Sequence, residues 1–289
     1  MAERGPAAQW LHRQARATTA AFGRLTAPMR MTPSFVVAGA QRCGTTSLYK
    51  TLVDHPDVMS AGLHKGVHYF DTAYDRGPRW YRSHFPLELT ARRREASTGI
   101  RPMTGEASPY YMFHPLVAER MAKDLPDVKV IVMLRDPVER AYSAFTHETA
   151  RGFETETFER AVALEGERLA GVDEAFVSDP YHLSLAHQHN AYVARGYYVD
   201  QLIRLEKHLG RDRLHVVDSD DLFMDHAPTF EAVTRFLGLR SWQPDGFQKR
   251  NARPRRALEG TLREQLEDHF APYDDRLAQW WGRTPSWRA

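Results

Sequence analysis

Three short segments of the chain, each built around an uninterrupted apolar run, alternate with segments of helical periodicity. They are SFVVAGA at 34–40, VKVIVML at 128–134 and LHVVDSDDL at 214–222. Continuous apolar runs of this length are typical of parallel strands that are covered on both faces. We therefore predict strands at these three places.

Helical segments lie between and after the predicted strands. In the segment at 135–152, Asp136 can cap the helix, Pro137 takes the first helical position and Glu139 completes a box-like start. The five predicted helices cover GTTSLYKTLVDHP at 44–56, GPRWYRSHFP at 77–86, RDPVERAYSAFTHETARG at 135–152, AYVARGYYVDQLIRLEKHLG at 191–210 and APTFEAVTRFLGL at 227–239.

The helix predicted at 191–210 has an apolar face, and Gly210 is expected to end it. The residues expected on that face are Val199, Leu202, Ile203 and Leu209.

Strands that alternate with helices indicate an α/β fold in which helices flank a mostly parallel sheet. The chain of 289 residues shows no repeat and no low-complexity linker, so we predict a single domain at 33–289 after an N-terminal arm at 1–32. The arm is rich in arginine and weakly resembles an organelle transit peptide, but we interpret it as a surface segment. Ligands of such sheets bind at the carboxyl ends of the strands.

Composition narrows the class of partner. The net charge is only +2, which argues against a nucleic-acid partner. The single cysteine excludes an intrachain disulfide framework and indicates a reducing, cytoplasmic location. No apolar run is long enough to span a membrane.

The first candidate site is GAQRCGTTSL at 39–48, directly after the first predicted strand. Gly39, Gly44 and Thr46 match the phosphate-binding pattern G-x-x-x-x-G-K-[ST] at all of its defined positions except the lysine, so we predict a P-loop-type fold. The alternative is that the two glycines only form an ordinary turn from a strand into a helix. Thr45 replaces the motif lysine, and the cation has moved inside the loop to Arg42. This change suits a phosphate group of lower charge and no metal ion.

A second candidate site follows the second predicted strand. Arg135 leaves that strand before a capped helix, and Ser143 lies two turns along the helix. An arginine and a hydroxyl near the start of a helix can bind a phosphate. Two anion sites at two strand ends indicate a ligand with two separated phosphate groups.

These segments together resemble the sulfotransferases that use 3′-phosphoadenylyl sulfate (PAPS). GAQRCGTTSL resembles their 5′-phosphosulfate loop, and VIVMLRDPVERAYSAF resembles their 3′-phosphate motif. Four further segments resemble elements of the glycan-modifying, heparan sulfate-type and bacterial branch. They are KGVHYFD, RWYRSHFP, GEASPYYMFHP and RGYYVDQLIRLEKHLGRDRLHVVDSDDL. KRNARPRR stands where the family has a basic loop that closes over the cofactor. The resemblance covers roughly 33–287.

The resemblance implies transfer of a sulfuryl group from PAPS to a hydroxyl, or less readily an amine, with release of 3′,5′-ADP. It implies that Arg42 neutralises charge on the departing phosphate. It also implies no metal ion and an acceptor that is a glycan or another small molecule. The cofactor-binding residues it implies are Gln41, Arg42, Cys43, Gly44, Thr45, Thr46, Ser47, Arg135, Ser143, Tyr198, Arg250 and Asn251.

The general base departs from the family pattern. The glycan branch has a glutamate after the lysine of its K-E-x-H-F-F-D element, whereas Gly66 stands there in this chain. We expect His68 to act as the base, since neutral histidine suits proton transfer near pH 7. The alternative is that His68 only orients the loop or the substrate. Other base candidates are His64, Asp71 and Glu106, and we expect Lys65, His68 and Glu106 to contact the acceptor.

Two other functions stay open at this point. A P-loop nucleotide kinase or hydrolase would share the first loop. A non-catalytic PAPS- or 3′,5′-ADP-binding protein would share both loops and would explain Gly66. The N-terminal arm could also mediate contacts in a homo-oligomer.

Three histidines, one cysteine and four aromatic residues are also considered as site residues. We assign His182, His187 and His189 to an acceptor-side loop in preference to a metal site. The helix start beside Cys43 could lower the pKa of its thiol, but no base partner is evident for a nucleophile. Trp80, Tyr81, Trp280 and Trp281 are expected to be packing residues.

Overall fold

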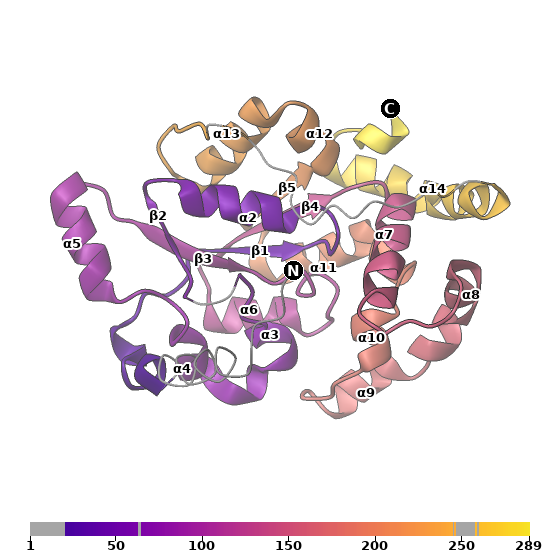
Figure 1. Cartoon of the computed structure of the whole chain (residues 1–289), viewed down its shortest axis with the longest axis horizontal. Coiled ribbons are helices and arrows are strands. Elements are labelled where there is room, and N and C mark those ends of the chain that lie inside the picture. Colours follow the sequence, from indigo (N-terminus) through magenta and orange to yellow (C-terminus); the bar gives the residue numbers. More distant parts are fainter. Residues whose placement is uncertain (1–20, 63–64, 245, 247–257, 259) are drawn as a thin grey trace, which may run out of the picture.

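A computed structural model of the whole chain describes residues 21–62, 65–244, 246, 258 and 260–289. Its centre is a five-stranded parallel sheet with the strand order β2-β3-β1-β4-β5 (Figure 1). The strands are β1 (Phe35–Gly39), β2 (Val58–Ser60), β3 (Met103–Ala107), β4 (Lys129–Leu134) and β5 (Leu214–Asp218). The predicted α/β class with a parallel sheet flanked by helices is confirmed.

The three strands predicted from apolar runs are β1, β4 and β5, although β5 ends at Asp218 and a helix follows it directly. All five residues of β1 are buried, and so are the last five of β4, as expected for strands covered on both faces. β2 and β3 were not predicted. β2 has only three residues, and β3 reads MTGEA, which has no apolar run.

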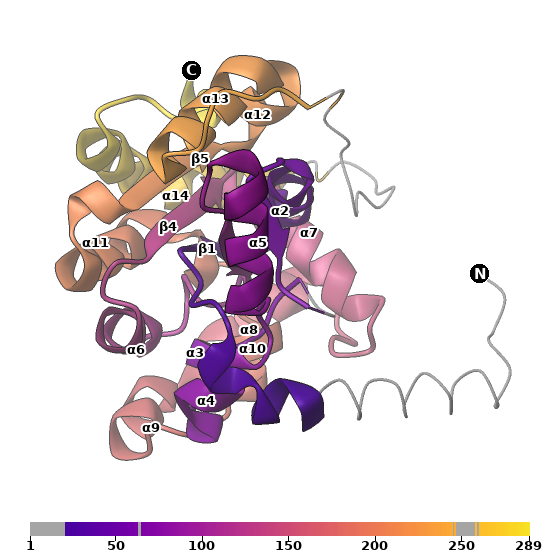
Figure 2. The same ribbon diagram turned by 90° about the vertical axis from the view of Figure 1, so that its left-hand side faces the viewer.

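Helices cover both faces of the sheet (Figures 1 and 2). Helix α2 contacts β1, β2 and β3 on one face, and α11 packs on α6 across the other face. The helices are α2 (Thr45–Asp54), α3 (Tyr69–Thr72), α4 (Gly77–Arg82), α5 (Glu88–Thr98), α6 (Val117–Asp124), α7 (Pro137–Thr149), α8 (Phe158–Leu169), α9 (Val172–Ser178), α10 (Leu185–His189), α11 (Tyr198–Leu209), α12 (Ser219–Met224), α13 (His226–Leu237) and α14 (Thr261–Trp281). Short 3₁₀ turns are η1 (Ala27–Met29), η2 (Tyr74–Arg76), η3 (Ala194–Gly196), η4 (Arg211–Arg213) and η5 (Ser286–Arg288).

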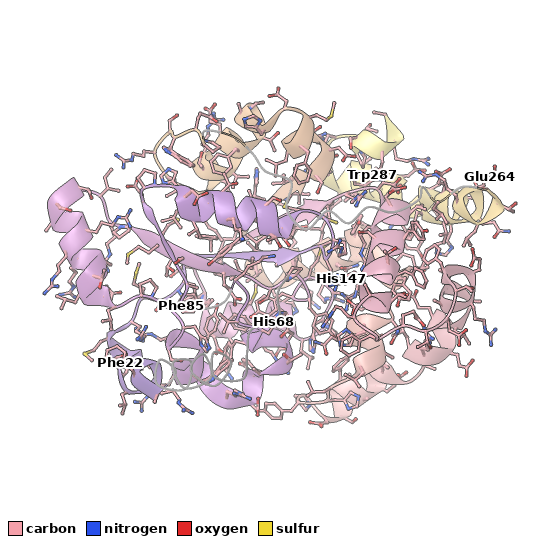
Figure 3. All side chains as sticks on the ribbon, in the orientation of Figure 1. Phe22, His68, Phe85, His147, Glu264 and Trp287 are labelled. Atoms are coloured by element: carbon pink, nitrogen blue, oxygen red, sulfur yellow. The ribbon has the colours of Figure 1, made fainter. Side chains whose placement is uncertain are left out.

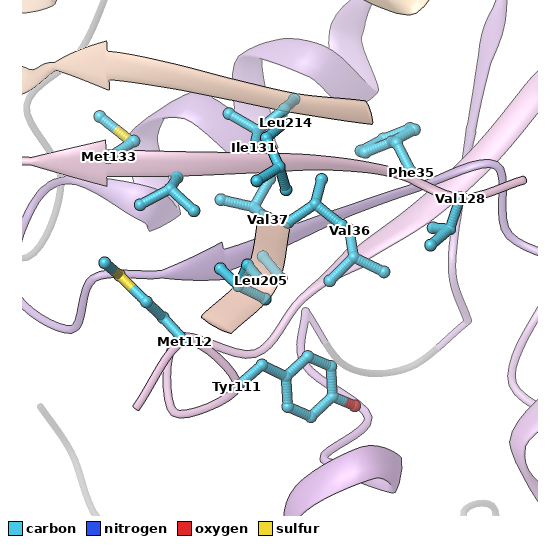
Figure 4. Packing of buried hydrophobic residues seen from close by; sticks show 14 of the residues in the cluster. Phe35, Val36, Val37, Tyr111, Met112, Val128, Ile131, Met133, Leu205 and Leu214 are labelled. Atoms are coloured by element: carbon cyan, nitrogen blue, oxygen red, sulfur yellow. The ribbon is translucent and has the colours of Figure 1, made fainter. Parts of the chain in front are cut away.

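The hydrophobic core lies between these helices and the sheet. Figure 4 shows Val37 of β1 beside Ile131 of β4, and Phe35 of β1 and Leu205 of α11 belong to the same cluster of buried residues. The core fixes the two central strands, and the loops at their carboxyl ends are therefore held by rigid elements.

The observed helix α11 differs from its prediction in its first residue and in one residue of its buried face. Helix α11 begins at Tyr198, seven residues later than predicted, because η3 precedes it. Ile203 is 44% exposed, so its assignment to the buried face was wrong, and Leu205 takes that place. The start of α7 is confirmed, since the Asp136 carboxylate accepts hydrogen bonds from the backbone N–H groups of Val138 and Glu139. The Glu139 side chain instead pairs with Arg135 and Arg263.

The described end of the predicted arm packs on the domain. Ala27 and Met31 are buried, and an Arg30 guanidinium N–H donates to the Phe85 carbonyl oxygen. Residues 21–31 therefore lie against α4 (Figure 2). Within the part of the chain that the structure describes, no helix combines the length and the apolarity that a membrane crossing needs.

Candidate active site

The first predicted phosphate loop connects β1 to α2. Gly44 precedes the helix with a φ of 88°, a left-handed conformation that favours glycine. A Cβ atom there would also lie 2.9 Å from the Phe223 ring. The Ser219 hydroxyl donates to the Cys43 carbonyl oxygen and ties the loop to α12. The first turn of α2 carries N–H groups that point out of the helix and the positive end of its dipole, so the turn can bind an anion.

Two buried arginines support this loop from behind. Arg140 Nε donates to the Gln41 carbonyl oxygen at 3.1 Å, and Arg195 Nη1 donates to Gln41 Oε1 at 2.6 Å. Their other hydrogen bonds also go to neutral oxygens. Neither guanidinium contacts a carboxylate among the described residues, and both therefore add positive charge next to the loop. The Gln41 side chain, predicted to bind the cofactor, is occupied in holding the loop.

Lys65 reaches the phosphate loop from a different part of the chain. Its Nζ donates to the hydroxyls of Thr46 at 2.8 Å and Thr45 at 3.1 Å. Burial, reinforced by the charges of Lys50 and Arg42, lowers the pKa of Lys65 to about 7. The cation missing after Gly44 is thus supplied by Lys65, which was predicted to contact the acceptor.

Arg42 lies between the two predicted phosphate sites. It has a φ of 73°, and its Nε donates to Ser143 Oγ at 3.2 Å. Ser143 belongs to α7, so this contact joins the first loop to the second. The predicted neighbourhood of the two motifs is therefore observed, because β1 and β4 are paired and their loops leave the same edge of the sheet.

Arg135 stands at the carboxyl end of β4. Its Nη2 lies 3.4 Å from Glu139 Oε2, and its side chain is 24% exposed. Glu139 also pairs with Arg263 of α14, so its charge is shared between two arginines. Arg135 can therefore turn to an anion without giving up a strong, exclusive ion pair.

Tyr198 and Cys43 lie deeper than expected. The Tyr198 hydroxyl donates to the Arg135 carbonyl oxygen at 3.0 Å and lies 3.9 Å from Cys43 Sγ. Both side chains are about 1% exposed, so each fixes the loops and neither presents its side chain to a ligand. Burial raises the pKa of the Cys43 thiol to about 11, although nearby arginines act in the opposite direction. The expectation of a lowered pKa was wrong.

Glu106 at the end of β3 is buried. Its Oε2 accepts hydrogen bonds from the Val67 N–H at 2.7 Å and the Ser108 hydroxyl at 2.7 Å. Its Oε1 accepts from the hydroxyls of Tyr81 at 3.0 Å and Tyr111 at 2.8 Å. With no exposed surface and four donors, Glu106 holds the 65–68 loop in place. This geometry corrects its assignment as a base candidate and an acceptor contact.

His68 and Asp71 form a hydrogen-bonded pair beside this network. His68 Nδ1 lies 2.8 Å from Asp71 Oδ2, and the Asp71 side chain has no exposed surface while that of His68 is 44% exposed. Burial lowers the pKa of His68, but the hydrogen bond and charge of Asp71 outweigh it, so the pKa is raised. No described residue bonds to Nε2. His68 therefore offers Nε2 to a ligand, and Asp71 acts as its partner.

Gly66 occupies a place where a side chain would not fit. A Cβ atom there would lie 2.7 Å from the Ala107 carbonyl oxygen and 3.0 Å from Ser108 Oγ. It would also lie 3.4 Å from His68 Nε2. The loop is thus packed for glycine, and His68 is the titratable group next to the position where the family pattern has glutamate.

Some predicted residues fall outside the described part of the chain, namely His64, Arg250 and Asn251. Their assignments stay predictions.

The histidines of 182–189 are packing residues in large part. His187 Nδ1 lies 2.6 Å from the Tyr110 hydroxyl, and burial lowers the pKa of His187 to about 2. His189 Nδ1 lies 3.1 Å from Glu148 Oε2. Among the described residues, no group of three or more His, Cys, Asp or Glu side chains could hold a metal ion.

The arrangement brings anion binding and proton transfer to one edge of the sheet. Two cations, Arg42 and Lys65, lie at the first loop, and Arg135 lies at the second. His68, which is labelled in Figure 3, lies three residues after Lys65. Arg140 and Arg195, which support the first loop, were not predicted as site residues. Arg140 lay inside the RDPVERAYSAF segment, but only its burial identifies it as a support for the loop.

The sulfotransferase domain family matches residues 32–252.

Curated relatives and a solved structure are similar to the chain. Human bifunctional heparan sulfate N-deacetylase/N-sulfotransferase 2 is 28% identical over 215 residues, which are 72% of this chain and 22% of that protein. Mouse heparan sulfate glucosamine 3-O-sulfotransferase 3B1 is 25% identical over 279 residues, 88% of this chain and 65% of that protein. The chain thus spans less than two thirds of these relatives. The solved structure of a sulfotransferase from Alicyclobacillus acidocaldarius is similar to this chain, with 30% sequence identity and a TM-score of 0.65. The similarity covers 90% of this chain and 100% of that chain.

Proposed function

Because this chain belongs to the sulfotransferase domain family, we propose that it is an enzyme that transfers a sulfuryl group from PAPS to an acceptor hydroxyl, with release of 3′,5′-ADP. The observation that carries the proposal is the pairing of two anion-binding loops with the His68–Asp71 pair at one edge of the sheet. The acceptor we propose is a carbohydrate or another small molecule, in line with the curated relatives whose names specify heparan sulfate.

The donor-binding residues fit a nucleotide with two separated phosphate groups. Thr45, Thr46 and Lys65 surround the start of α2, where the 5′-phosphosulfate would bind. Arg135 and Ser143 would hold the 3′-phosphate, and Arg42 lies between the two groups. When bound, PAPS supplies an activated sulfuryl group on a phosphate that leaves readily.

The acceptor hydroxyl must lose a proton as its oxygen attacks sulfur. His68 Nε2 is placed to accept that proton, and Asp71 fixes the ring through Nδ1 and stabilises the imidazolium that forms. Lys65 and Arg42 stabilise the negative charge that grows on the departing phosphate. No covalent enzyme intermediate is needed, because positioning and charge stabilisation suffice for this class of transfer.

The site supports the two alternative functions, a nucleotide kinase or hydrolase and a non-catalytic nucleotide-binding protein, less well than sulfuryl transfer. In a nucleotide kinase an acid after a second strand helps to hold Mg²⁺, whereas Asp136 caps α7 and pairs with Arg263. A non-catalytic binding protein would not require the exposed Nε2 of a histidine oriented by a buried carboxylate. A cytoplasmic location stays a prediction.

Calorimetry with 3′,5′-ADP, 5′-ADP and ATP, without added metal, tests the proposed donor site. We expect 3′,5′-ADP to bind most tightly, and Arg135→Ala to weaken it about 10- to 100-fold because a charge-assisted contact is lost. Arg92→Ala, a change at an exposed arginine of α5, is the matched control and should leave the affinity unchanged. ATP binding as tightly as 3′,5′-ADP, or an Arg135→Ala protein that binds normally, would favour the kinase alternative.

Lys65 should make donor binding depend on pH. Because its pKa is lowered to about 7, Lys65 is largely neutral at pH 8, and an anion on Thr45 and Thr46 should restore its charge. We expect binding of 3′,5′-ADP at pH 8 to take up roughly one proton at Lys65, and binding at pH 6 to take up almost none there. Calorimetry in buffers of different ionisation enthalpy measures this uptake. An uptake at pH 8 that persists in Lys65→Met would assign it to another group.

A further inference from the structure

The N-terminal segment at 21–31 packs on the domain through one of its faces. Residues 21–25 are helical, and η1 follows them. Gly23, Thr26 and Ala27 are buried. A Cβ atom on Gly23 would lie 2.8 Å from the carbonyl oxygen of Ser83 at the end of α4. The side chains on the other face of the segment are therefore held at fixed places on the surface.

That other face presents three large apolar side chains to solvent. Phe22 is 52% exposed, Leu25 is 80% exposed and Met29 is 58% exposed. Their spacing of three and four residues places them on one side of a helical segment, and we call these three residues the apolar row. Figure 3 shows Phe22 at the lower left edge of the molecule, apart from His68. Single exposed apolar residues need no explanation, whereas a row of three indicates a contact surface.

Positive charge lies beside the apolar row. Arg24, which precedes Leu25 in the chain, lines a hollow of about 510 Å³ together with Arg76, Arg79 and Trp80. No ion pair joins these three arginines to a carboxylate among the residues that the structure describes. The sequence around the row is equally one-sided, because residues 4–31 contain five arginines and no acidic residue. The row and the hollow thus join an apolar surface to a positive one.

This combination favours a lipid surface over a second copy of the chain. A helical segment with large apolar side chains on one face and arginines beside them is typical of segments that lie in the interface of a membrane. Tryptophan, which Trp80 supplies at the hollow, is also common at that depth. Two copies that met through their apolar rows would bring their arginines together, and residues 4–31 hold no carboxylate to offset this charge.

We propose that this face of the protein docks on the surface of a membrane that contains anionic lipids. The apolar row would insert at the boundary between headgroups and acyl chains, and the arginines of the hollow would contact the lipid phosphates. The segment would lie on the membrane and would not cross it. The inference is independent of the proposed reaction, because neither the row nor the hollow includes a residue of the candidate active site.

Co-sedimentation of the full chain with lipid vesicles tests the proposal. Vesicles of equal parts phosphatidylcholine and phosphatidylglycerol should bind the protein at least about 10-fold more tightly than vesicles of phosphatidylcholine alone. Phe22→Gln/Leu25→Gln should weaken this binding at least about 10-fold, because less apolar surface inserts. Leu185→Gln/Met224→Gln, which changes two exposed apolar residues of α10 and α12, is the matched control and should change binding less than about 2-fold.

The contribution of charge needs its own pair of variants. Arg76→Gln/Arg79→Gln should weaken binding to the anionic vesicles about 10-fold at low salt, and the difference from the unchanged protein should shrink as salt increases. Arg160→Gln/Lys207→Gln removes the same charge from exposed positions of α8 and α11 and should change binding less than about 2-fold. Thermal unfolding of each variant without vesicles shows whether lost binding reflects lost folding.

Three results would overturn the inference. One is a full chain that does not sediment with the anionic vesicles. Another is an equal loss of binding in Phe22→Gln/Leu25→Gln and in its control, which would indicate general adsorption of the protein. The third is self-association in the absence of vesicles that Phe22→Gln/Leu25→Gln abolishes. That result, measured by sedimentation velocity, would assign the apolar row to an interface between two copies of the chain.

Discussion

Replacing His68 with alanine should lower kcat about 100- to 10,000-fold, the range by which a positioned general base contributes to proton transfer. The assay measures 3′,5′-ADP release from PAPS with an acceptor found by screening oligosaccharides and phenols. The loss follows from the geometry, since Nε2 is the exposed nitrogen of a ring that Asp71 holds from the other side. Binding of 3′,5′-ADP should change little, because none of its proposed contacts involves the imidazole.

The pH dependence of the reaction identifies the base. Asp71 raises the pKa of His68, so the ring stays protonated to a higher pH than an ordinary histidine. Only the neutral ring accepts a proton, and kcat should therefore rise as the pH increases through this raised pKa. In Asp71→Asn the pKa of His68 should fall, which moves the rising limb of the profile to lower pH and lowers its plateau.

Two controls separate catalysis from folding. His208→Ala changes an exposed histidine of α11 and should leave both kcat and the profile unchanged. His68→Gln keeps a polar side chain in the loop and should be as inactive as alanine if proton transfer is the role of His68. A His68→Gln protein with near-normal kcat would instead assign His68 to orientation of the loop or the acceptor.

The central strands could be predicted from the sequence because uninterrupted apolar runs such as VIVML are typical of strands buried on both faces. β3 could not, because its position depends on contacts with neighbouring elements and not on its own composition. Gly105 of this strand lies so close to β1 that a Cβ atom would be 2.4 Å from the Phe35 carbonyl oxygen. The next residue, Glu106, is buried because two tyrosines and two further donors satisfy it. Only the tertiary structure supplies such partners.

The candidate site also combines features that could be predicted from the sequence with features that depend on the folded structure. Its two loops follow local patterns, so their positions and their approach at one sheet edge could be predicted from the chain. The contacts between segments that are distant in the sequence could not be predicted, because they depend on the packing of long side chains in the folded protein. Lys65 crosses from one loop to another, and Arg195 reaches Gln41 from 154 positions away. Glu106 was assigned to the acceptor because nothing in the residues around it indicates that its carboxylate points inward.

Lys65→Met should lower kcat about 100- to 1,000-fold, the loss expected when one preorganised donor to a developing negative charge is removed. Lys65 Nζ contacts the hydroxyls of both threonines that follow Gly44, where the phosphate loop of nucleoside triphosphate enzymes has its own lysine. Arg42 was predicted to be the main cation at this place, but its Nε is bonded to Ser143. We therefore expect Lys65→Met to reduce kcat more than Arg42→Met does.

Lys50 of α2, whose charge acts on Lys65, provides a matched control for the Lys65→Met variant. It is exposed, and its charge helps to lower the pKa of Lys65. Lys50→Met should thus raise the pKa of Lys65, extend its protonated state to higher pH and maintain kcat there, whereas Lys65→Met removes the charge at every pH. Equal losses of kcat in the two variants would show that the reaction senses only the total charge near α2. A larger loss in Arg42→Met than in Lys65→Met would return the main role to the arginine, as the sequence had indicated.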